Sequence, residues 1–64
     1  MKVILRNPRR EVELEGVRRV ADVFRRLELV PESYLVIRSG ELVTNDDAVA
    51  DHDVLELRPV ISGG

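Results

Sequence analysis

Hydrophobic and polar residues alternate in two short runs at the start of the chain. The first run places Val3 and Leu5 on one side and Lys2, Ile4 and Arg6 on the other, and the second places Val12 and Leu14 against Glu11, Glu13 and Glu15. A period of two residues is typical of half-buried strands. A turn at Asn7-Pro8-Arg9-Arg10 is expected to join them, because proline favours a type I turn. On the inner face this turn pairs Leu5 with Val12 and Val3 with Leu14. On the outer face it pairs Arg6 with Glu11, Ile4 with Glu13 and Lys2 with Glu15.

Helical periodicity replaces this alternation after Gly16. The apolar residues at the spacing of one helical face are Val20, Val23, Phe24 and Leu27. They predict an amphipathic helix over about residues 19–28, which Pro31 ends. Further strands are predicted at residues 34–38, 41–43 and 54–58. Before the last strand lies a polar loop over residues 44–53, with one helical turn around residues 47–50. The order β-β-α-β-β-β is that of an α+β domain.

Length and composition limit the function. A chain of 64 residues suits one domain, and we expect residues 1–60 to form it and residues 61–64 to be a flexible C-terminal tail. No cysteine is present, which excludes disulfides, thiolate nucleophiles and cysteine-based zinc sites and fits a reducing cytoplasm. No apolar run is long enough for a membrane span or a signal peptide. So small a chain rarely builds a substrate pocket, so no catalytic residue is expected.

Charge is distributed unevenly along the chain. Residues 1–31 carry a formal charge of +3 and residues 32–64 carry −5. One interpretation is that both halves form ordinary solvated surfaces, and the other is that the acidic half docks on a basic partner. The net charge of −2 and the scarcity of aromatic side chains argue against direct nucleic-acid binding.

Two polar features of the loop region are candidates for ligand binding. His52 is a lone histidine between two aspartates, which favours a solvated turn residue over a metal ligand or a general base. The neighbouring carboxylates are Asp46, Asp47, Asp51 and Asp53. They lack the spacing and the closing glutamate of a calcium loop, so turn formation explains them better and no metal site is expected.

A third feature is the Gly63-Gly64 pair after a predicted strand and a short linker. Glycine has no Cβ, so such a tail can enter a tunnel too narrow for other residues. A terminal carboxylate is ionised at neutral pH and is unreactive until it is activated, for example as a mixed anhydride with AMP. The chain has no phosphate-binding glycine loop, so this activation requires another protein that uses ATP.

The strand order, the length and the ending Ile61-Ser62-Gly63-Gly64 resemble the ubiquitin-like sulfur carrier proteins of bacteria, which are the ThiS, MoaD and TtuB families and share the β-grasp fold. The resemblance covers the whole chain. Residues 36–43 are similar to the central hairpin of these carriers. Residues 51–57 take the place of their acidic-Gly-Asp turn, with His52 where glycine is usual. The first and last residues look closest to the TtuB type.

This resemblance implies that an E1-like enzyme adenylates Gly64 with ATP, and that sulfur from a cysteine desulfurase or a rhodanese converts it to a thiocarboxylate. It also implies that Ile61, Ser62 and Gly63 enter the active site of the partner. For the TtuB type the sulfur goes to a tRNA uridine through a tRNA thiolase. The alternatives are thiamine thiazole (ThiS-like), molybdopterin (MoaD-like), or a ubiquitin-like modifier joined to lysines of target proteins. No bound cofactor is expected on the chain itself.

Strand parity predicts the surface that meets these partners. If Val36 faces the core, its neighbours Leu35 and Ile37 face outward. The hairpin pattern puts Ile4 outward as well. Together with Val60 near the tail, these residues are expected to form an apolar docking patch. The alternative is that they are scattered surface aliphatics with no function.

Overall fold

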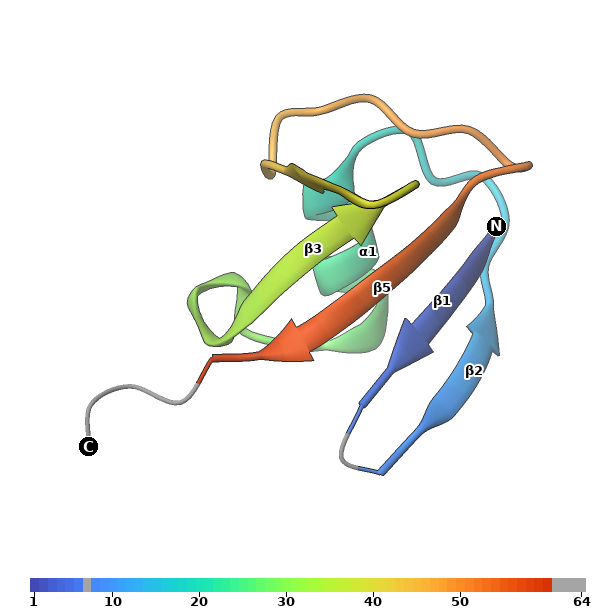
Figure 1. The fold of residues 1–64 in the computed structure, drawn as a ribbon. Helices are drawn as coiled ribbons and strands as arrows, with labels where there is room; N and C mark the ends of the chain where they lie inside the picture. The colour runs from blue at the N-terminus through green and yellow to red at the C-terminus, as the bar shows by residue number, and fades with distance from the viewer. Residues whose placement is uncertain (7, 61–64) are drawn as a thin grey trace.

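A computed structural model describes residues 1–6 and 8–60, which form a five-stranded sheet with a helix packed on it (Figure 1). In chain order the elements are β1 (Lys2–Leu5), β2 (Arg10–Glu13), α1 (Val20–Leu27), the 3-10 turn η1 (Pro31–Ser33), β3 (Tyr34–Arg38), β4 (Glu41–Val43) and β5 (Val54–Pro59). The sheet order is β2-β1-β5-β3-β4, in which β1 and β5 run parallel and the other neighbours run antiparallel. The predicted order of strands and helix, and with it the α+β class, is confirmed.

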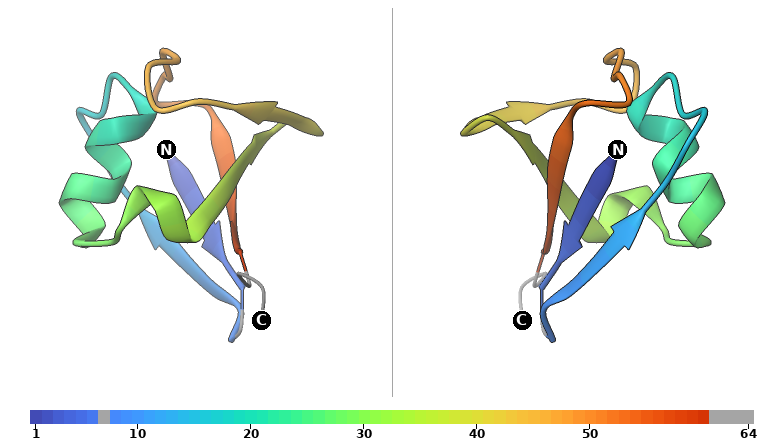
Figure 2. Two further views of the ribbon diagram at one scale, coloured as in Figure 1. Left: turned by 90° about the vertical axis from the view of Figure 1, so that its left-hand side faces the viewer. Right: turned by 90° about the vertical axis from the view of Figure 1, so that its right-hand side faces the viewer.

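Helix α1 covers one face of the sheet and leaves the other face open (Figure 2). The core lies between helix and sheet, because both present aliphatic side chains there. Its fully buried side chains are Phe24, Leu55, Leu57, Val3, Val20 and Val23. The ring of Phe24 lies 6.1 Å from that of Tyr34 at the start of β3. We call the sheet surface that points away from α1 the outer face.

The hairpin of β1 and β2 has the predicted faces but not the predicted register, which is wrong by two residues. The observed pairs are Lys2 with Glu13, Val3 with Val12, Ile4 with Glu11 and Leu5 with Arg10. A shift of two residues keeps every side chain on its own face. The observed register also brings Met1 into the ladder. Its amino group donates to the carbonyl of Leu14 at 2.8 Å, the N–H of Leu14 donates back at 2.8 Å, and the Met1 side chain is buried.

The loop between β4 and β5 has no helical turn around residues 47–50, so that prediction is wrong. Its backbone caps α1 instead. The N–H groups of Val20 and Ala21 donate to the carbonyls of Asp47 (3.1 Å) and Asn45 (3.0 Å). The first N–H groups of a helix have no hydrogen-bond acceptor within the helix. The carbonyls of Asn45 and Asp47 provide acceptors for two of them.

Charges from the two halves of the chain are interleaved in the sheet. Strand β1 from the first half lies beside β5 from the second half. Arg6 of the first half forms an ion pair at 2.9 Å with Glu56 of the second half. Docking of the acidic half on a basic partner stays a prediction, and any such surface includes side chains from both halves of the chain.

Candidate functional site

The middle of the outer face is a row of side chains that crosses neighbouring strands. Ile4 of β1 lies beside Glu56 of β5, and Glu56 lies opposite Ile37 of β3. Ile37 lies opposite Leu42 of β4. These residues share one face because successive side chains of a strand point to opposite sides, and the neighbours of Glu56 in β5 are buried. The row therefore places aliphatic side chains on both sides of a single carboxylate.

The predicted docking residues lie on or beside this face. Ile4 and Ile37 are half-buried, Leu35 is 48% exposed and Val60 is 43% exposed. Val60 follows β5 directly, and its N–H donates to the carbonyl of Ser33 at 2.8 Å. This bond ties the base of the tail to the end of η1. The structure thus places the four residues where the prediction needs them, and their docking role stays a prediction.

Two further aliphatic residues belong to the same surface and were not predicted. Leu42 is 67% exposed on β4, and Val54 is 48% exposed at the start of β5. Strand parity could have found both, because each lies next to an inward-facing residue, Val43 and Leu55 respectively. We call the resulting surface the outer patch, formed by Ile4, Leu35, Ile37, Leu42, Val54 and Val60.

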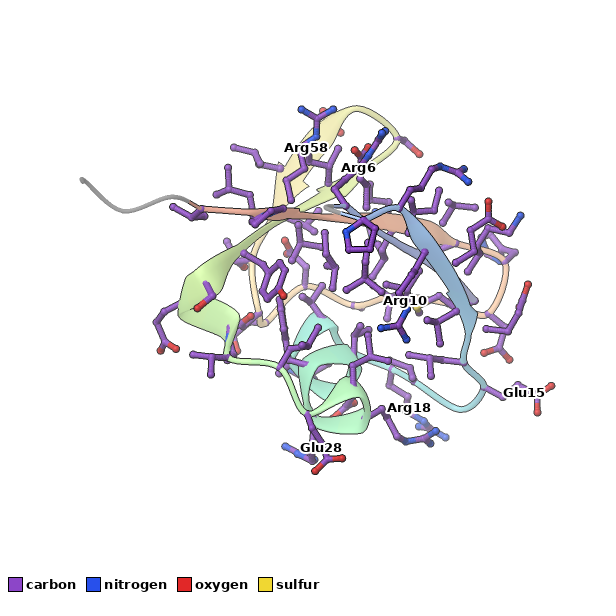
Figure 3. All side chains as sticks on the ribbon, turned by 90° about the horizontal axis from the view of Figure 1, so that it is seen from below. Arg6, Arg10, Glu15, Arg18, Glu28 and Arg58 are labelled. Atoms are coloured by element: carbon purple, nitrogen blue, oxygen red, sulfur yellow. The ribbon has the colours of Figure 1, made fainter. Side chains whose placement is uncertain are left out.

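Two arginines share the carboxylate of Glu56 on the outer face, and Figure 3 shows them on the side of the sheet away from the helix. The Nε atoms of Arg6 and Arg58 each donate to Oε2 of Glu56 at 2.9 Å. These contacts lower the pKa of the Glu56 carboxyl from its usual value of 4.5, and the hydrogen bond from Arg58 has the largest effect. We call Arg6 and Arg58 the arginine pair.

Glu11 is a similar shared carboxylate near the edge of the sheet. It lies 3.5 Å from Nζ of Lys2 and 2.9 Å from Nη2 of Arg9. The positive charge of Lys2 is the main cause of a lowered pKa at the Glu11 carboxyl, and the hydrogen bond from Arg9 adds to it. Charged side chains along an edge strand oppose pairing with another chain, so β2 is a protected edge rather than a docking edge.

The acidic loop residues form turns. Oδ2 of Asp47 accepts from the N–H of Thr44 at 2.7 Å, and Oδ2 of Asp53 accepts from the N–H of Ala50 at 2.8 Å. His52 is exposed in a turn. Within residues 1–6 and 8–60, no group of three or more His, Cys, Asp or Glu side chains is placed to hold a metal ion. The turn-forming role expected of the aspartates is confirmed for Asp47 and Asp53.

The helix side of the molecule carries a polar cavity of about 240 Å³, lined by Gly16, Asp22, Arg25 and Arg26. Arg25 and Asp22 already form an ion pair at 3.3 Å. The carboxylate of Asp22 is thus paired with a guanidinium group, and the other charged side chain of the lining is Arg26. The outer face and the base of the tail remain the candidate site.

Comparisons with known proteins agree with this geometry. The model of the ThiS family matches residues 3–64. This chain belongs to the ThiS family. It is also 45% identical over 65 aligned residues to the sulfur carrier protein TtuB of Thermus thermophilus, and the alignment covers all of both chains. Membership of the ThiS family confirms the β-grasp fold and the resemblance to ubiquitin-like sulfur carriers.

The family match extends over the tail residues Ile61, Ser62, Gly63 and Gly64, which lie outside the described residues. In the part of the chain that is described, no helix is long and apolar enough to cross a membrane. The structure describes the residues that precede this segment, which include the outer patch, the arginine pair and the hydrogen bond from Val60 to Ser33.

Proposed function

We propose that this ThiS-family chain is a sulfur carrier that holds sulfur as a thiocarboxylate at Gly64. The observation that carries the proposal is the full-length similarity to the sulfur carrier protein TtuB, with a family match that runs through Gly64. The composition supports it, because a chain with no cysteine can hold transferable sulfur only at its carboxyl end. The chain is then a cytoplasmic co-substrate of other enzymes rather than a catalyst.

The proposed chemistry needs two partners. An E1-like enzyme binds ATP, the carboxylate oxygen of Gly64 attacks the α-phosphorus, and pyrophosphate leaves. The terminal sulfur of a persulfide on a cysteine desulfurase or a rhodanese then attacks the carbonyl carbon, and AMP leaves with the electron pair of the broken C–O bond. A thiol attacks the donor-side sulfur of the acyl disulfide so formed, which releases the thiocarboxylate and leaves a disulfide on the donor side. The resulting thiocarboxylate is a better nucleophile than the carboxylate it replaces, so it can pass sulfur to an acceptor.

The outer patch is the proposed docking surface for the E1-like enzyme. Burial of its aliphatic side chains against a partner removes them from water and so favours binding. Val60 is held at Ser33, so the tail starts from a fixed point beside the patch. In this proposal Ile61, Ser62 and Gly63 enter the active site of the partner, where the missing Cβ atoms of glycine permit a narrow tunnel.

A tRNA uridine, modified by a tRNA thiolase, is the proposed sulfur acceptor. Support comes from the relative, which is a TtuB-type carrier. A host strain that lacks this chain should lose 2-thiouridine from its tRNA and keep its thiamine and molybdopterin. Loss of thiamine or molybdopterin with normal tRNA would contradict this choice of acceptor and leave the carrier function in place.

The intact mass of the chain tests the carrier function itself. After incubation with ATP and with the E1-like enzyme and the sulfur donor of the same host, we expect a mass gain equal to the exchange of one oxygen for one sulfur. Deletion of Gly64 should abolish the gain while circular dichroism shows an unchanged fold. A native chain that never gains sulfur would contradict the proposal, and addition of the chain to a lysine of a target protein would identify a modifier instead.

A further inference from the structure

The arginine pair brings together two positive charges from distant parts of the chain. Strands β1 and β5 run parallel with Ile4 beside Glu56 and Leu5 beside Leu57. Arg6 and Arg58 follow Leu5 and Leu57 directly, and both contact the same oxygen of Glu56. Two guanidinium groups at adjacent positions repel each other, and the single carboxylate of Glu56 stabilises them by accepting from both.

This cluster keeps an excess of positive charge. Two guanidinium groups and one carboxylate give a local charge of +1. Only the Nε of each arginine is used for Glu56, so most of the N–H donors of each guanidinium are not used by that carboxylate. The side chains of Arg6 and Arg58 are 45% and 57% exposed to solvent. A second carboxylate can therefore reach the pair from solvent.

The neighbours of the pair are apolar and belong to the outer patch. Leu35 lies opposite Arg58, and Ile4 and Ile37 flank Glu56 on its two sides. A charge bordered by aliphatic side chains suits a protein surface that buries both kinds of group together. A nucleic-acid backbone instead favours many unpaired cations and few aliphatic groups.

We propose that Arg6 and Arg58 bind a carboxylate side chain on the enzyme that activates the carboxyl end of this chain, and that Glu56 holds the two guanidinium groups in position until that enzyme docks. The inference rests on the proposed carrier function and names the chemistry of the partner at the docking surface. Because desolvated guanidinium–carboxylate contacts are directional, the pair selects the partner and its orientation while the aliphatic residues supply buried area.

The pair acts on docking and not on the adenylation chemistry. Gly64 lies six positions beyond Arg58 in the sequence. An extended tail of that length spans about 20 Å, so the reacting carboxylate and the ATP phosphates lie far from Arg58 when the tail is inserted. Loss of the pair should therefore change the concentration of carrier that the enzyme needs and leave the rate at saturation nearly unchanged.

The test is the kinetics of ATP-dependent pyrophosphate release by the E1-like enzyme of the host, with the full chain as the varied substrate. We expect Arg6→Ala and Arg58→Ala to raise KM, and the double variant to raise it about tenfold or more at low salt with kcat within about twofold. High salt should reduce the difference. The matched control is Arg25→Ala, an exposed arginine on the helix that is also paired with one carboxylate, Asp22. Its KM should stay within about twofold of the native value.

Glu56→Gln separates docking from a purely structural role. If the arginine pair only links β1 to β5, Glu56→Gln should lower thermal stability and raise KM as much as the double arginine variant. In our proposal Glu56→Gln keeps an oxygen that can accept from both Nε atoms and leaves both arginines charged, so KM should rise much less than in the double arginine variant. If the native chain is adenylated and the double arginine variant has the native KM, the inference about the arginine pair is wrong and the carrier proposal is unaffected. A double variant that loses binding to tRNA and keeps binding to the enzyme would also overturn the inference, whereas a native chain that is not adenylated overturns the carrier proposal itself.

Discussion

At the residue scale, Glu11 and Glu56 each accept contacts from two basic groups, and this determines how they respond to acid. Lys2 and Arg9 surround Glu11, and the arginine pair surrounds Glu56. Each carboxyl therefore has a lower pKa in the folded chain than its usual value of 4.5. The folded chain binds these protons less readily than the unfolded chain, so both groups make stability depend on pH.

We predict that acid weakens the fold through these two carboxylates. Their contribution to stability is fully present above pH 4.5 and is lost as the pH falls through the lowered pKa values of the folded state. The urea midpoint should therefore fall between about pH 5 and pH 3. The double variant Glu11→Gln/Glu56→Gln should show a flatter decline, and high salt should flatten the native curve because both groups are near solvent. As a control, Glu15→Gln should keep the native slope, and an unchanged slope in the double variant would refute the assignment.

The partners of Glu56 show where prediction from sequence stops at this scale. Alternation along residues 54–58 predicts correctly that Glu56 points outward between Leu55 and Leu57. Its contact with Arg6 joins residues 50 positions apart and depends on the register of β1 against β5. No local pattern encodes that register, so the sequence alone paired Arg6 with the nearer Glu11.

At the element scale, the loop over residues 44–53 and helix α1 depend on each other. Arg19, the N-cap residue of α1, has no side-chain oxygen that could accept from the first N–H groups of the helix. The loop supplies these acceptors through the carbonyls of Asn45 and Asp47. Helical periodicity predicted α1 to within a residue at each end, but it could not show that the cap comes from a loop more than twenty positions away.

Asp47 should be the side chain that shapes this cap. Its Oδ2 accepts from the N–H of Thr44 at 2.7 Å and so fixes the turn whose carbonyls face the helix. We expect Asp47→Ala to lower the free energy of unfolding by about 1 kcal/mol and to speed hydrogen exchange at the amides of Val20 and Ala21. Asp46→Ala is the matched control, because Asp46 is exposed within the same turn. Equal exchange rates in the two variants would show that the side chain does not support the cap.

At the scale of the whole molecule, the sheet has two unlike faces, and this division follows from the period-two patterns of the sequence. One face packs on α1 and forms the core, and the other carries the outer patch. Parity predicted the outward residues within the longer strands. The prediction left out Leu42, in a strand of three residues, and Val54, at the start of its strand, although each lies next to an inward-facing residue. Their joining into one surface depends on the strand order, which local patterns do not specify.

The outer patch makes a prediction that concerns the molecule as a docking unit. Leu35 and Leu42 are exposed, so Leu35→Ser/Leu42→Ser should change the free energy of unfolding by no more than about 1 kcal/mol. If the patch is buried by the activating enzyme, the same variant should raise the KM for adenylation about tenfold or more, because two aliphatic side chains no longer contribute to binding. Val30→Ser is the matched control, since Val30 is 58% exposed in the segment between α1 and η1 and is not part of the outer patch. Equal KM values for the native chain and the double variant, with the fold intact, would leave the patch as ordinary surface and would move the search for the docking site to the helix side.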